Sequence, residues 1–137
     1  MTALWQDPLD IAQCLNANRV AIVGLSSNPA RPSHGVASYL KAVGYEVIPV
    51  NPSETTILGL PCYPSLKAIP DQVDWVDVFR QSDAVMPIAE DAITIGAKGL
   101  WLQLGVVNEA ALTLARDAGL ACVADLCPKI EHQRRSR

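Results

Sequence analysis

The fold is decided by Arg19-Val20-Ala21-Ile22-Val23-Gly24, a short and nearly continuous apolar run that ends in glycine. Such a β-branched run is typical of a parallel strand that is buried on both faces. A polar stretch follows it, and residues 33–43 then place apolar side chains on one helical face. We expect Ser33 to be the N-cap of this helix and Gly44 to end it. The sequence therefore predicts a strand, a turn and a helix in succession.

The same alternation of strand and helix continues along the chain. Further strands are predicted at residues 46–50, 75–79, 99–104 and 120–124, with short extended pieces over residues 57–63. Helical segments are predicted at residues 7–16, 66–69, 82–95 and 108–118, the last two capped by Ser82 and Asn108. Alternating strands and helices form crossovers and a mostly parallel sheet. The sequence therefore predicts an α/β, Rossmann-like three-layer sandwich of about five strands, in one domain over residues 1–137.

Composition and charge limit the functions that this domain can have. Half of the 137 residues are hydrophobic and the mean hydropathy is +0.18, which is enough apolar material for a buried core. The net charge is −3, but a basic tail over residues 129–137 carries net +3 and leaves −6 on the rest of the chain. An acidic body argues against nucleic acid as a partner. We expect the last residues of the tail, Arg134-Arg135-Ser136-Arg137, to be a solvated terminus rather than a binding arm.

The cysteines indicate the compartment. The four cysteines, Cys14, Cys62, Cys122 and Cys127, form no C-x-x-C pair, and no secretory signal precedes them. No apolar stretch reaches the length that spans a membrane, so we expect no membrane partner. The sequence therefore predicts a cytoplasmic protein whose thiols are reduced.

The first turn, after Gly24, is where a nucleotide fold holds phosphate groups. In open α/β sheets the ligand binds beyond the carboxyl ends of the strands, and a helix N-terminus there faces the anion. Ser26 and Pro29 stand where G-x-G-x-x-G has its second and third glycines, so a dinucleotide fits less well. Donors suited to phosphate remain in this turn: the hydroxyl groups of Ser26, Ser27 and Ser33 and the guanidinium of Arg31.

Residues at the ends of the later strands help to distinguish between possible ligands. The second strand ends in Asn51-Pro52, where NAD-binding folds place an acidic residue that accepts from the ribose hydroxyls. The nearest carboxylate after it is Glu54, so the sequence disfavours NAD. Arg80 follows the strand predicted at residues 75–79 and is either a ligand contact or an ordinary exposed side chain. Gln103 lies at the end of the strand predicted at residues 99–104 and is either a ligand contact or an ordinary strand residue.

Groups that would indicate catalysis are scarce. The sequence has no nucleophile elbow of the G-x-S-x-G type, and no pair of carboxylates stands out. His34 and His132 have no metal-ligand spacing with the cysteines, and we expect His34 to face solvent and His132 to be inert in the tail. Cys127 follows the last strand, and we expect it to be a buried structural residue. The residues therefore favour a binding module over an enzyme.

Several motifs together make the chain similar to a known family along nearly its whole length. They are Val23-Gly24-Leu25-Ser26, Arg31-Pro32-Ser33-His34-Gly35-Val36, Val50-Asn51-Pro52, Ile57-Leu58-Gly59, Val76-Asp77-Val78-Phe79-Arg80, Leu100-Trp101-Leu102-Gln103-Leu104-Gly105-Val106 and Cys127-Pro128-Lys129-Ile130-Glu131. In number and order they resemble the small stand-alone bacterial proteins that consist of a CoA-binding domain. The chain is also similar to the N-terminal CoA-binding domain of the succinyl-CoA synthetase alpha subunit, which has a close counterpart of Leu58-Gly59-Leu60-Pro61.

The resemblance implies a Rossmann-like domain that binds coenzyme A or an acyl-CoA. By analogy with the synthetase, Ser26, Ser27 and Asn28 meet the CoA phosphates, and residues 51–53 and 78–80 form further contact regions. The synthetase lysine after the second strand has no counterpart in this sequence, and neither does the domain with the phosphorylated histidine, so we carry over no ligase reaction. The expected cofactor contacts are Gly24, Leu25, Ser26, Ser27, Asn28, Arg31, Ser33, Asn51, Pro52, Ser53, Phe79, Arg80, Gln103 and Gly105, with no catalytic residue and no metal ligand.

The leading hypothesis is a protein that holds CoA or acyl-CoA at the first strand, turn and helix, without chemistry by this chain. One alternative is a small enzyme that uses NAD(P) or handles CoA thioesters, with Cys127 as its thiol. Another is a subunit of a larger acyl-CoA ligase, which would need a ligase-like partner chain. A homo-oligomer is compatible with each of these hypotheses.

Overall fold

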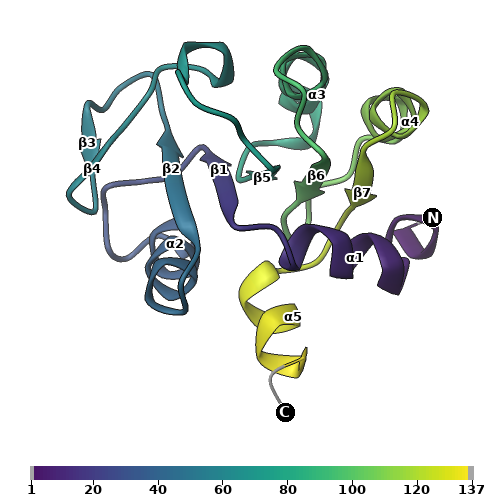
Figure 1. Ribbon diagram of the computed structural model, residues 1–137, viewed down its shortest axis with the longest axis horizontal. Coiled ribbons are helices and arrows are strands. Elements are labelled where there is room, and N and C mark those ends of the chain that lie inside the picture. The colour runs from purple at the N-terminus through teal and green to yellow at the C-terminus, as the bar shows by residue number, and fades with distance from the viewer. Residues whose placement is uncertain (1, 136–137) are drawn as a thin grey trace.

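The computed structural model describes residues 2–135 and shows a parallel sheet between two layers of helices (Figure 1). Within these residues the main sheet has five strands in the order β2-β1-β5-β6-β7. Their bounds are β1 Arg19–Val23, β2 Glu46–Val50, β5 Trp75–Val78, β6 Gly99–Leu102 and β7 Ala121–Val123. All neighbouring strands are parallel, so their carboxyl ends share one edge of the sheet. The strand order reverses between β1 and β5, which is the switch point where such folds bind ligands.

Helices cover both faces of the sheet (Figure 1). One face carries α1 Pro8–Leu15, α2 Pro32–Ala42 and α5 Pro128–Arg135, and the other carries α3 Val85–Thr94 and α4 Glu109–Asp117. Short 3₁₀ helices lie at η1 Thr2–Trp5, η2 Leu66–Ala68 and η3 Ser82–Ala84. Because both faces are covered, the strands are nearly continuous apolar runs, as the sequence predicts for β1. The predicted three-layer, Rossmann-like architecture is confirmed.

Two tryptophans anchor the core on the face covered by α1, α2 and α5. Trp75 on β5 and Trp101 on β6 are both fully buried, and their ring centroids lie 5.6 Å apart. The indole N–H of Trp75 donates to the carbonyl oxygen of Ala17 at 3.1 Å, and that of Trp101 donates to Leu126 at 2.8 Å. Large buried aromatic groups are stable here because their single polar atoms are satisfied.

A small hairpin extends the β2 edge of the sheet. β3 Thr56–Ile57 and β4 Leu60–Pro61 pair antiparallel, which confirms the short extended pieces predicted over this region. Leu58 and Gly59 between them have φ angles of 55° and 70°. Two successive residues in the left-handed region form the tight turn that suits the twist of a hairpin. An isolated parallel bridge between Val50 and Tyr63 joins the following segment to β2.

Two predicted helix caps are wrong. Helix α2 begins at Pro32 with Arg31 as its N-cap residue, because proline is favoured in the first turn, and Ser33 is therefore inside the helix. Ser82 is the first residue of η3, and its hydroxyl oxygen accepts from the backbone N–H of Val107 at 3.0 Å. Both serines use their hydroxyl groups in tertiary contacts instead of caps.

A third predicted cap is confirmed, and the strand predicted at residues 99–104 ends two residues early. The side-chain oxygen of Asn108 accepts from the Ala111 N–H at 3.0 Å at the start of α4. Strand β6 ends at Leu102, so Gln103 and Leu104 belong to the loop that follows it and not to the strand. Gln103 and Leu104 of this loop line a pocket.

The C-terminal residues 129–135 are helical, which the sequence does not predict, and Arg134 and Arg135 at the end of this helix are exposed, as expected for a solvated terminus. These residues belong to α5, which packs against α1 and α2. The hydroxyl oxygen of Tyr39 and Nδ1 of His132 lie 2.7 Å apart, and Arg135 donates to Oδ1 of Asn16 at 2.8 Å. A few specific contacts hold an otherwise polar helix, and hydrophobic periodicity does not reveal them. Residues 136 and 137 of the predicted tail lie outside the described residues.

The described chain contains no helix long and apolar enough to cross a membrane. Its four cysteines are free thiols, as the sequence predicts. Burial raises the pKa of Cys122 to about 12 and also raises the pKa of Cys14 and that of Cys62. Cys127 is buried, which confirms the expected placement.

Candidate functional site

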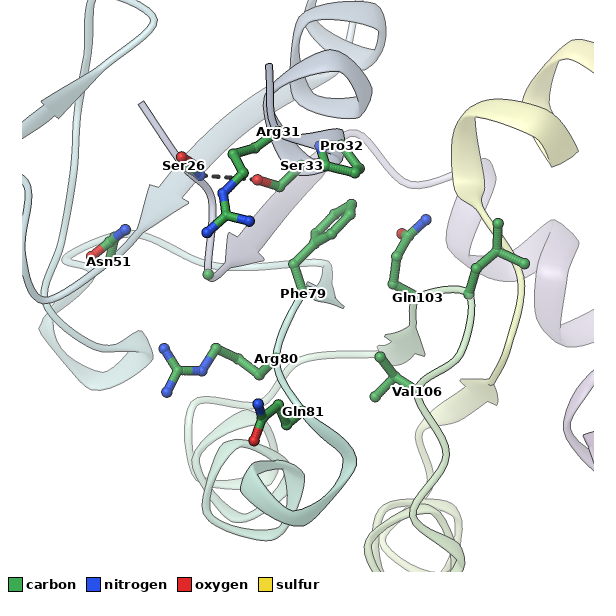
Figure 2. A pocket seen from close by; sticks show the side chains of 12 residues that line it. Ser26, Arg31, Pro32, Ser33, Asn51, Phe79, Arg80, Gln81, Gln103 and Val106 are labelled. Atoms are coloured by element: carbon green, nitrogen blue, oxygen red, sulfur yellow. Dashed lines mark hydrogen bonds between the residues drawn. The ribbon is translucent and has the colours of Figure 1, made fainter. Parts of the chain in front are cut away.

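A pocket of about 780 Å³ opens at the carboxyl ends of β1, β5 and β6. Figure 2 shows the side chains that line it. They come from the turn after β1, the start of α2, the end of β2 and the segments that follow β5 and β6: Gly24, Ser26, Arg31, Pro32, Ser33, Asn51, Phe79, Arg80, Gln81, Gln103, Leu104 and Val106. The pocket therefore spans the switch point of the sheet, where the topology favours ligand binding.

The turn begins at a glycine that no other residue can replace without strain. Gly24 has a φ of +85°, and a Cβ atom at this position would lie 2.3 Å from the carbonyl oxygen of Phe79. The backbone N–H of Gly24 donates to the Val50 carbonyl at 2.9 Å, and the N–H of Phe79 donates to the Val23 carbonyl at 2.8 Å. The ends of β1, β2 and β5 are thus held closely together at the floor of the pocket.

Ser33 closes the turn after β1 from the other side. Its hydroxyl oxygen accepts from the backbone N–H of Ser26 at 3.0 Å, and the residue is 5% exposed. The Ser26 hydroxyl oxygen in turn accepts from the Asn28 N–H, and the Asn28 side chain accepts from the Ala30 N–H, both at 3.0 Å. Several amides expected to face an anion are therefore used inside the turn. Within the described chain, the backbone amides of Leu25, Ser27 and Ser33 remain without a hydrogen-bond partner.

Asn51 links the end of β2 to this turn. Its side-chain N–H donates to the Leu25 carbonyl at 2.9 Å, and its side-chain oxygen accepts from the Ser53 N–H at 2.8 Å. Ser27 donates to the Glu54 carboxylate at 3.3 Å. Asn51 therefore uses both ends of its amide to hold backbone segments in place.

Two arginines give the pocket its charge. Arg31 precedes α2 and Arg80 follows β5, and both are exposed. Figure 2 shows both guanidinium groups on the same side of the Phe79 ring. Neither makes an ion pair or hydrogen bond with any residue in the part of the chain that the structure describes. Two unpaired guanidinium groups beside one cavity form a site suited to phosphate groups, because each offers a planar fork of donors.

The other end of the pocket has a different character. Gln103 and Val106 lie on the other side of the Phe79 ring from the arginines (Figure 2), and Leu104, next to Gln103 in the chain, also lines the pocket. Gln103 is 7% exposed, and its side-chain oxygen has no hydrogen-bond partner among residues 2–135. This end therefore combines apolar side chains with one amide group and suits the neutral part of a ligand.

The loop at this end is fixed by a contact from β7. The Asp125 carboxylate accepts from the Gly105 N–H at 2.7 Å. Asp125 itself has a φ of 60°, in the left-handed region that aspartate tolerates better than most residues. The contact joins segments 20 residues apart and holds the loop that carries Leu104 and Val106.

Eight of the fourteen predicted site residues line the pocket: Gly24, Ser26, Arg31, Ser33, Asn51, Phe79, Arg80 and Gln103. The structure places the other six around it. Ser27, Asn28 and Ser53 belong to the hydrogen-bonded turns described above, Gly105 lies in the loop after β6, and Pro52 lines a neighbouring cavity of about 210 Å³ together with Arg80. Leu25 is fully buried, so its side chain packs in the core and only its backbone faces the turn.

Sequence reasoning missed four residues that line the pocket: Pro32, Gln81, Leu104 and Val106. Each of them lies within a motif or beside a predicted contact. Their position after a strand could therefore have identified them as lining residues. What the pattern did not show is which neighbour at a strand end turns inward. In residues 2–135 no group of three or more histidine, cysteine or acidic side chains is placed to hold a metal ion.

Comparison with known proteins identifies the family. Residues 18–133 match the CoA binding domain family. The chain belongs to this family. Its relatives include the uncharacterized protein YneT of Bacillus subtilis, which is 40% identical over 116 residues, 85% of this chain and 86% of YneT. The solved structure of a hypothetical protein from Pyrococcus horikoshii OT3 superposes with a TM-score of 0.88 and 41% identity, covering 92% of this chain and 89% of that chain.

The family domain also occurs within larger ligases. An ADP-forming acetate–CoA ligase of Archaeoglobus fulgidus is 32% identical over 92 residues, which are 66% of this chain but only 14% of the ligase. The dinucleotide-forming acetyl-coenzyme A synthetase 1 of Ca. Korarchaeum cryptofilum superposes with a TM-score of 0.68 and 25% identity, covering 80% of this chain and 26% of that chain. The predicted resemblance to CoA-binding domains is confirmed.

Proposed function

We propose that the protein binds coenzyme A or an acyl-CoA, with the ligand phosphates between Arg31 and Arg80. The observation that carries this proposal is the convergence of two unpaired guanidinium groups on one pocket of an otherwise acidic chain. An exposed arginine without an acidic partner is a weak feature alone. Two of them at the switch point of a nucleotide fold, in a member of the CoA binding domain family, support a bound anion.

The shape and polarity of the pocket fit a ligand with two different ends. A volume of about 780 Å³ lies within the range of roughly 300–1,000 Å³ that small-molecule sites occupy. CoA carries its phosphates on the nucleotide and has a neutral pantetheine arm. The arginine end suits the phosphates, and the end with Leu104 and Val106 suits the arm, because apolar side chains there cannot stabilise charge.

The same geometry disfavours NAD. NAD-binding folds need a carboxylate at the end of the second strand for the ribose hydroxyls. Here that position is Asn51, and both ends of its amide are engaged by Leu25 and Ser53. The Glu54 carboxylate accepts from Ser27. The residues at the end of β2 therefore stabilise the protein backbone rather than a ribose.

The proposal is for binding without chemistry by this chain. Cys127, the thiol that a CoA-handling enzyme would use, is buried and does not line the pocket. The cysteines with raised pKa values remain thiols, which are poor nucleophiles. The groups that line the pocket are guanidinium, amide, hydroxyl and apolar groups, which bind a ligand well.

Isothermal titration calorimetry with CoA, acetyl-CoA, NAD and NADP tests the proposal. We expect binding of both CoA species and none of NAD at the same concentrations. Arg31→Ala and Arg80→Ala should each weaken CoA binding by about ten- to a hundredfold, because a hydrogen bond to a charged group contributes roughly 1.5–3 kcal/mol. The loss should shrink as salt rises, since screening weakens exposed charge pairs.

Lys98→Ala is the matched control for the arginine variants. Lys98 is an exposed cation at the amino end of β6, on the opposite edge of the sheet from the pocket. Its removal changes the net charge equally and should leave CoA affinity within about twofold. If Lys98→Ala loses as much CoA affinity as the arginine variants do, the loss comes from net charge and not from contacts of Arg31 and Arg80 with the phosphates. Clear binding of NAD without binding of CoA would overturn the proposal.

A further inference from the structure

The structure buries three polar side chains among the residues whose side chains it describes: Ser33, Asp77 and Gln103. Ser33 accepts a hydrogen bond from Ser26. The other two are unexplained, since both carboxyl oxygens of Asp77 and the amide oxygen of Gln103 are buried without a hydrogen-bond partner in the described chain. An unpartnered buried polar group costs free energy, so a pair of them close together calls for a physical explanation.

The two side chains belong to neighbouring strands and to the same face of the sheet. Val76 and Val78 pack in the core beside α3 and α4, so Asp77 between them points to the opposite face, as Trp75 does. On the next strand Leu102 packs beside α3 and α4, and Gln103 follows it.

Figure 2 shows Gln103 pointing to the same side as Phe79, which packs on the Trp75 face. In the register of the sheet Asp77 pairs with Trp101, so Gln103 lies one strand across and two residues further along. Strand spacing and rise then place the two Cα atoms about 8 Å apart.

Asp77 lies beneath the floor of the pocket, whereas Gln103 lines it. Asp77 is fully buried and has Ile22 as its register partner on β1, two residues before Gly24. Gln103 lies on the far side of the Phe79 ring from the arginines, as Val106 does. One side chain therefore has no route to solvent, and the other connects that buried group to the ligand site.

The chemistry of the two groups is complementary. Burial raises the pKa of Asp77 well above its ordinary value, which favours the neutral carboxylic acid. A carboxylic acid has one O–H to donate, and the Gln103 side-chain oxygen is an acceptor. The glutamine side chain is long enough to bring this oxygen to the acid, directly or through one water molecule. The amide N–H₂ of Gln103 is then directed away from Asp77, into the pocket.

We propose that Asp77 is a positioning residue that orients Gln103, and that the Gln103 amide N–H₂ donates to a carbonyl oxygen on the neutral arm of the ligand. This inference rests on the proposed function, because the amide and thioester carbonyls of acyl-CoA lie on the pantetheine side of the molecule. Phosphate groups are excluded from this role by position, since the arginines lie on the other side of Phe79. Asp77 and Gln103 together therefore recognise the pantetheine arm of the ligand and not its nucleotide.

Binding of two ligands to four proteins tests the coupling. Calorimetry compares CoA with adenosine 3′,5′-bisphosphate, which has nucleotide phosphates and no pantetheine arm. Gln103→Met should lower the affinity for CoA at least tenfold and leave the affinity for the bisphosphate within about twofold of the original value. The reason is that methionine removes the amide group but has a similar volume. Asp77→Leu should give the same pattern. Asp77→Asn should restore CoA affinity to within about threefold of the original protein, because its amide N–H also donates to Gln103.

Three outcomes of the calorimetry overturn the inference. Gln103→Met could bind CoA as tightly as the original protein does, a variant could lose equal affinity for both ligands, or Asp77→Asn could bind CoA as weakly as Asp77→Leu.

If Asp77→Leu does not fold, the Gln103 side-chain amide resonance in ¹⁵N NMR provides the test instead. It should move in free Asp77→Asn and, in the original protein, shift with CoA but not with the bisphosphate. A resonance unmoved by Asp77→Asn also refutes the coupling. Failure of the original protein to bind CoA refutes the proposed function instead, whereas the resonance of the free protein still tests the Asp77–Gln103 contact.

Discussion

The Ser26 backbone N–H donates to the Ser33 hydroxyl oxygen at 3.0 Å, and this bond joins the two ends of the turn that follows β1. The two residues are seven positions apart, with Asn28 and Arg31 in the loop between them. Ser33 is held in the first turn of α2, so the helix itself fixes its position. The geometry of the turn around the arginine end of the pocket therefore depends on a serine that does not cap the helix.

We predict that Ser33→Ala loosens the turn and weakens ligand binding. The variant leaves the Ser26 N–H without its acceptor, which should lower the free energy of unfolding by about 1–2 kcal/mol. CoA affinity should also fall, because the loop that carries Arg31 is no longer held in one position. Ser38→Ala on the same helix is the control, and urea unfolding with calorimetry is the measurement. Equal stability of the two variants would contradict the role of this bond.

We predict that Gly24→Ala is far more damaging than an alanine at another glycine of similar backbone angle. Gly24 has φ +85° and a Cβ would meet the Phe79 carbonyl oxygen at 2.3 Å, whereas Gly96 has φ +77° and open space around it. Gly96→Ala should cost about 1 kcal/mol from backbone strain alone. Gly24→Ala should cost at least about twice as much and abolish CoA binding, since the Phe79–Arg80 backbone must move. Similar unfolding midpoints for the two variants would argue against the steric contact.

We predict that Asp77→Asn changes the pH dependence of stability. Because burial raises the pKa of Asp77, the folded protein keeps a proton that the unfolded chain loses above about pH 4. The stability that Asp77 contributes is therefore present at low pH and is lost as pH rises toward the raised pKa, by about 1.4 kcal/mol per pH unit.

The carboxyl group of Asp77 lies on the face that α1, α2 and α5 cover, where the buried titratable groups are the Cys14 and Cys127 thiols. In urea unfolding from pH 4 to pH 8, the free energy of unfolding of Asp77→Asn should increase relative to that of the original protein as pH rises. The exposed Asp117→Asn serves as the control for loss of one carboxylate. Parallel curves for Asp77→Asn and the original protein would refute the buried neutral acid.

We predict that Asp125→Ala frees the loop after β6. The variant removes the acceptor of the Gly105 N–H, which is bonded at 2.7 Å, and places alanine at a φ of 60°. Asp125→Asn keeps the side-chain oxygen and tolerates the backbone angle, so it should behave nearly as the original protein. Hydrogen exchange of the Gly105 amide should speed up at least tenfold in Asp125→Ala only. Unchanged exchange would show that the contact does not hold the loop.

The placement of the elements was predictable because local patterns determine it. The apolar run that ends at Gly24, the Asn108 cap and the alternation of strands with helices each depend on residues near one another in sequence. The misplaced caps at Ser33 and Ser82 have a common cause. A serine at a helix start satisfies the same pattern whether its hydroxyl binds the helix backbone or, as here, a distant N–H.

The sequence by itself determined the α/β sandwich, the position of the turn after β1 and the resemblance to CoA-binding domains, since these follow from periodicity and from motifs in order. Only the tertiary structure decided that Arg31 and Arg80 face one pocket, and that Asp77 and Gln103 are buried on one face of adjacent strands. These relationships join residues 49 and 26 positions apart, by the numbering of the chain. The physical reason is that charge pairing and burial are properties of surroundings, and the surroundings of a side chain exist only once distant strands have packed together.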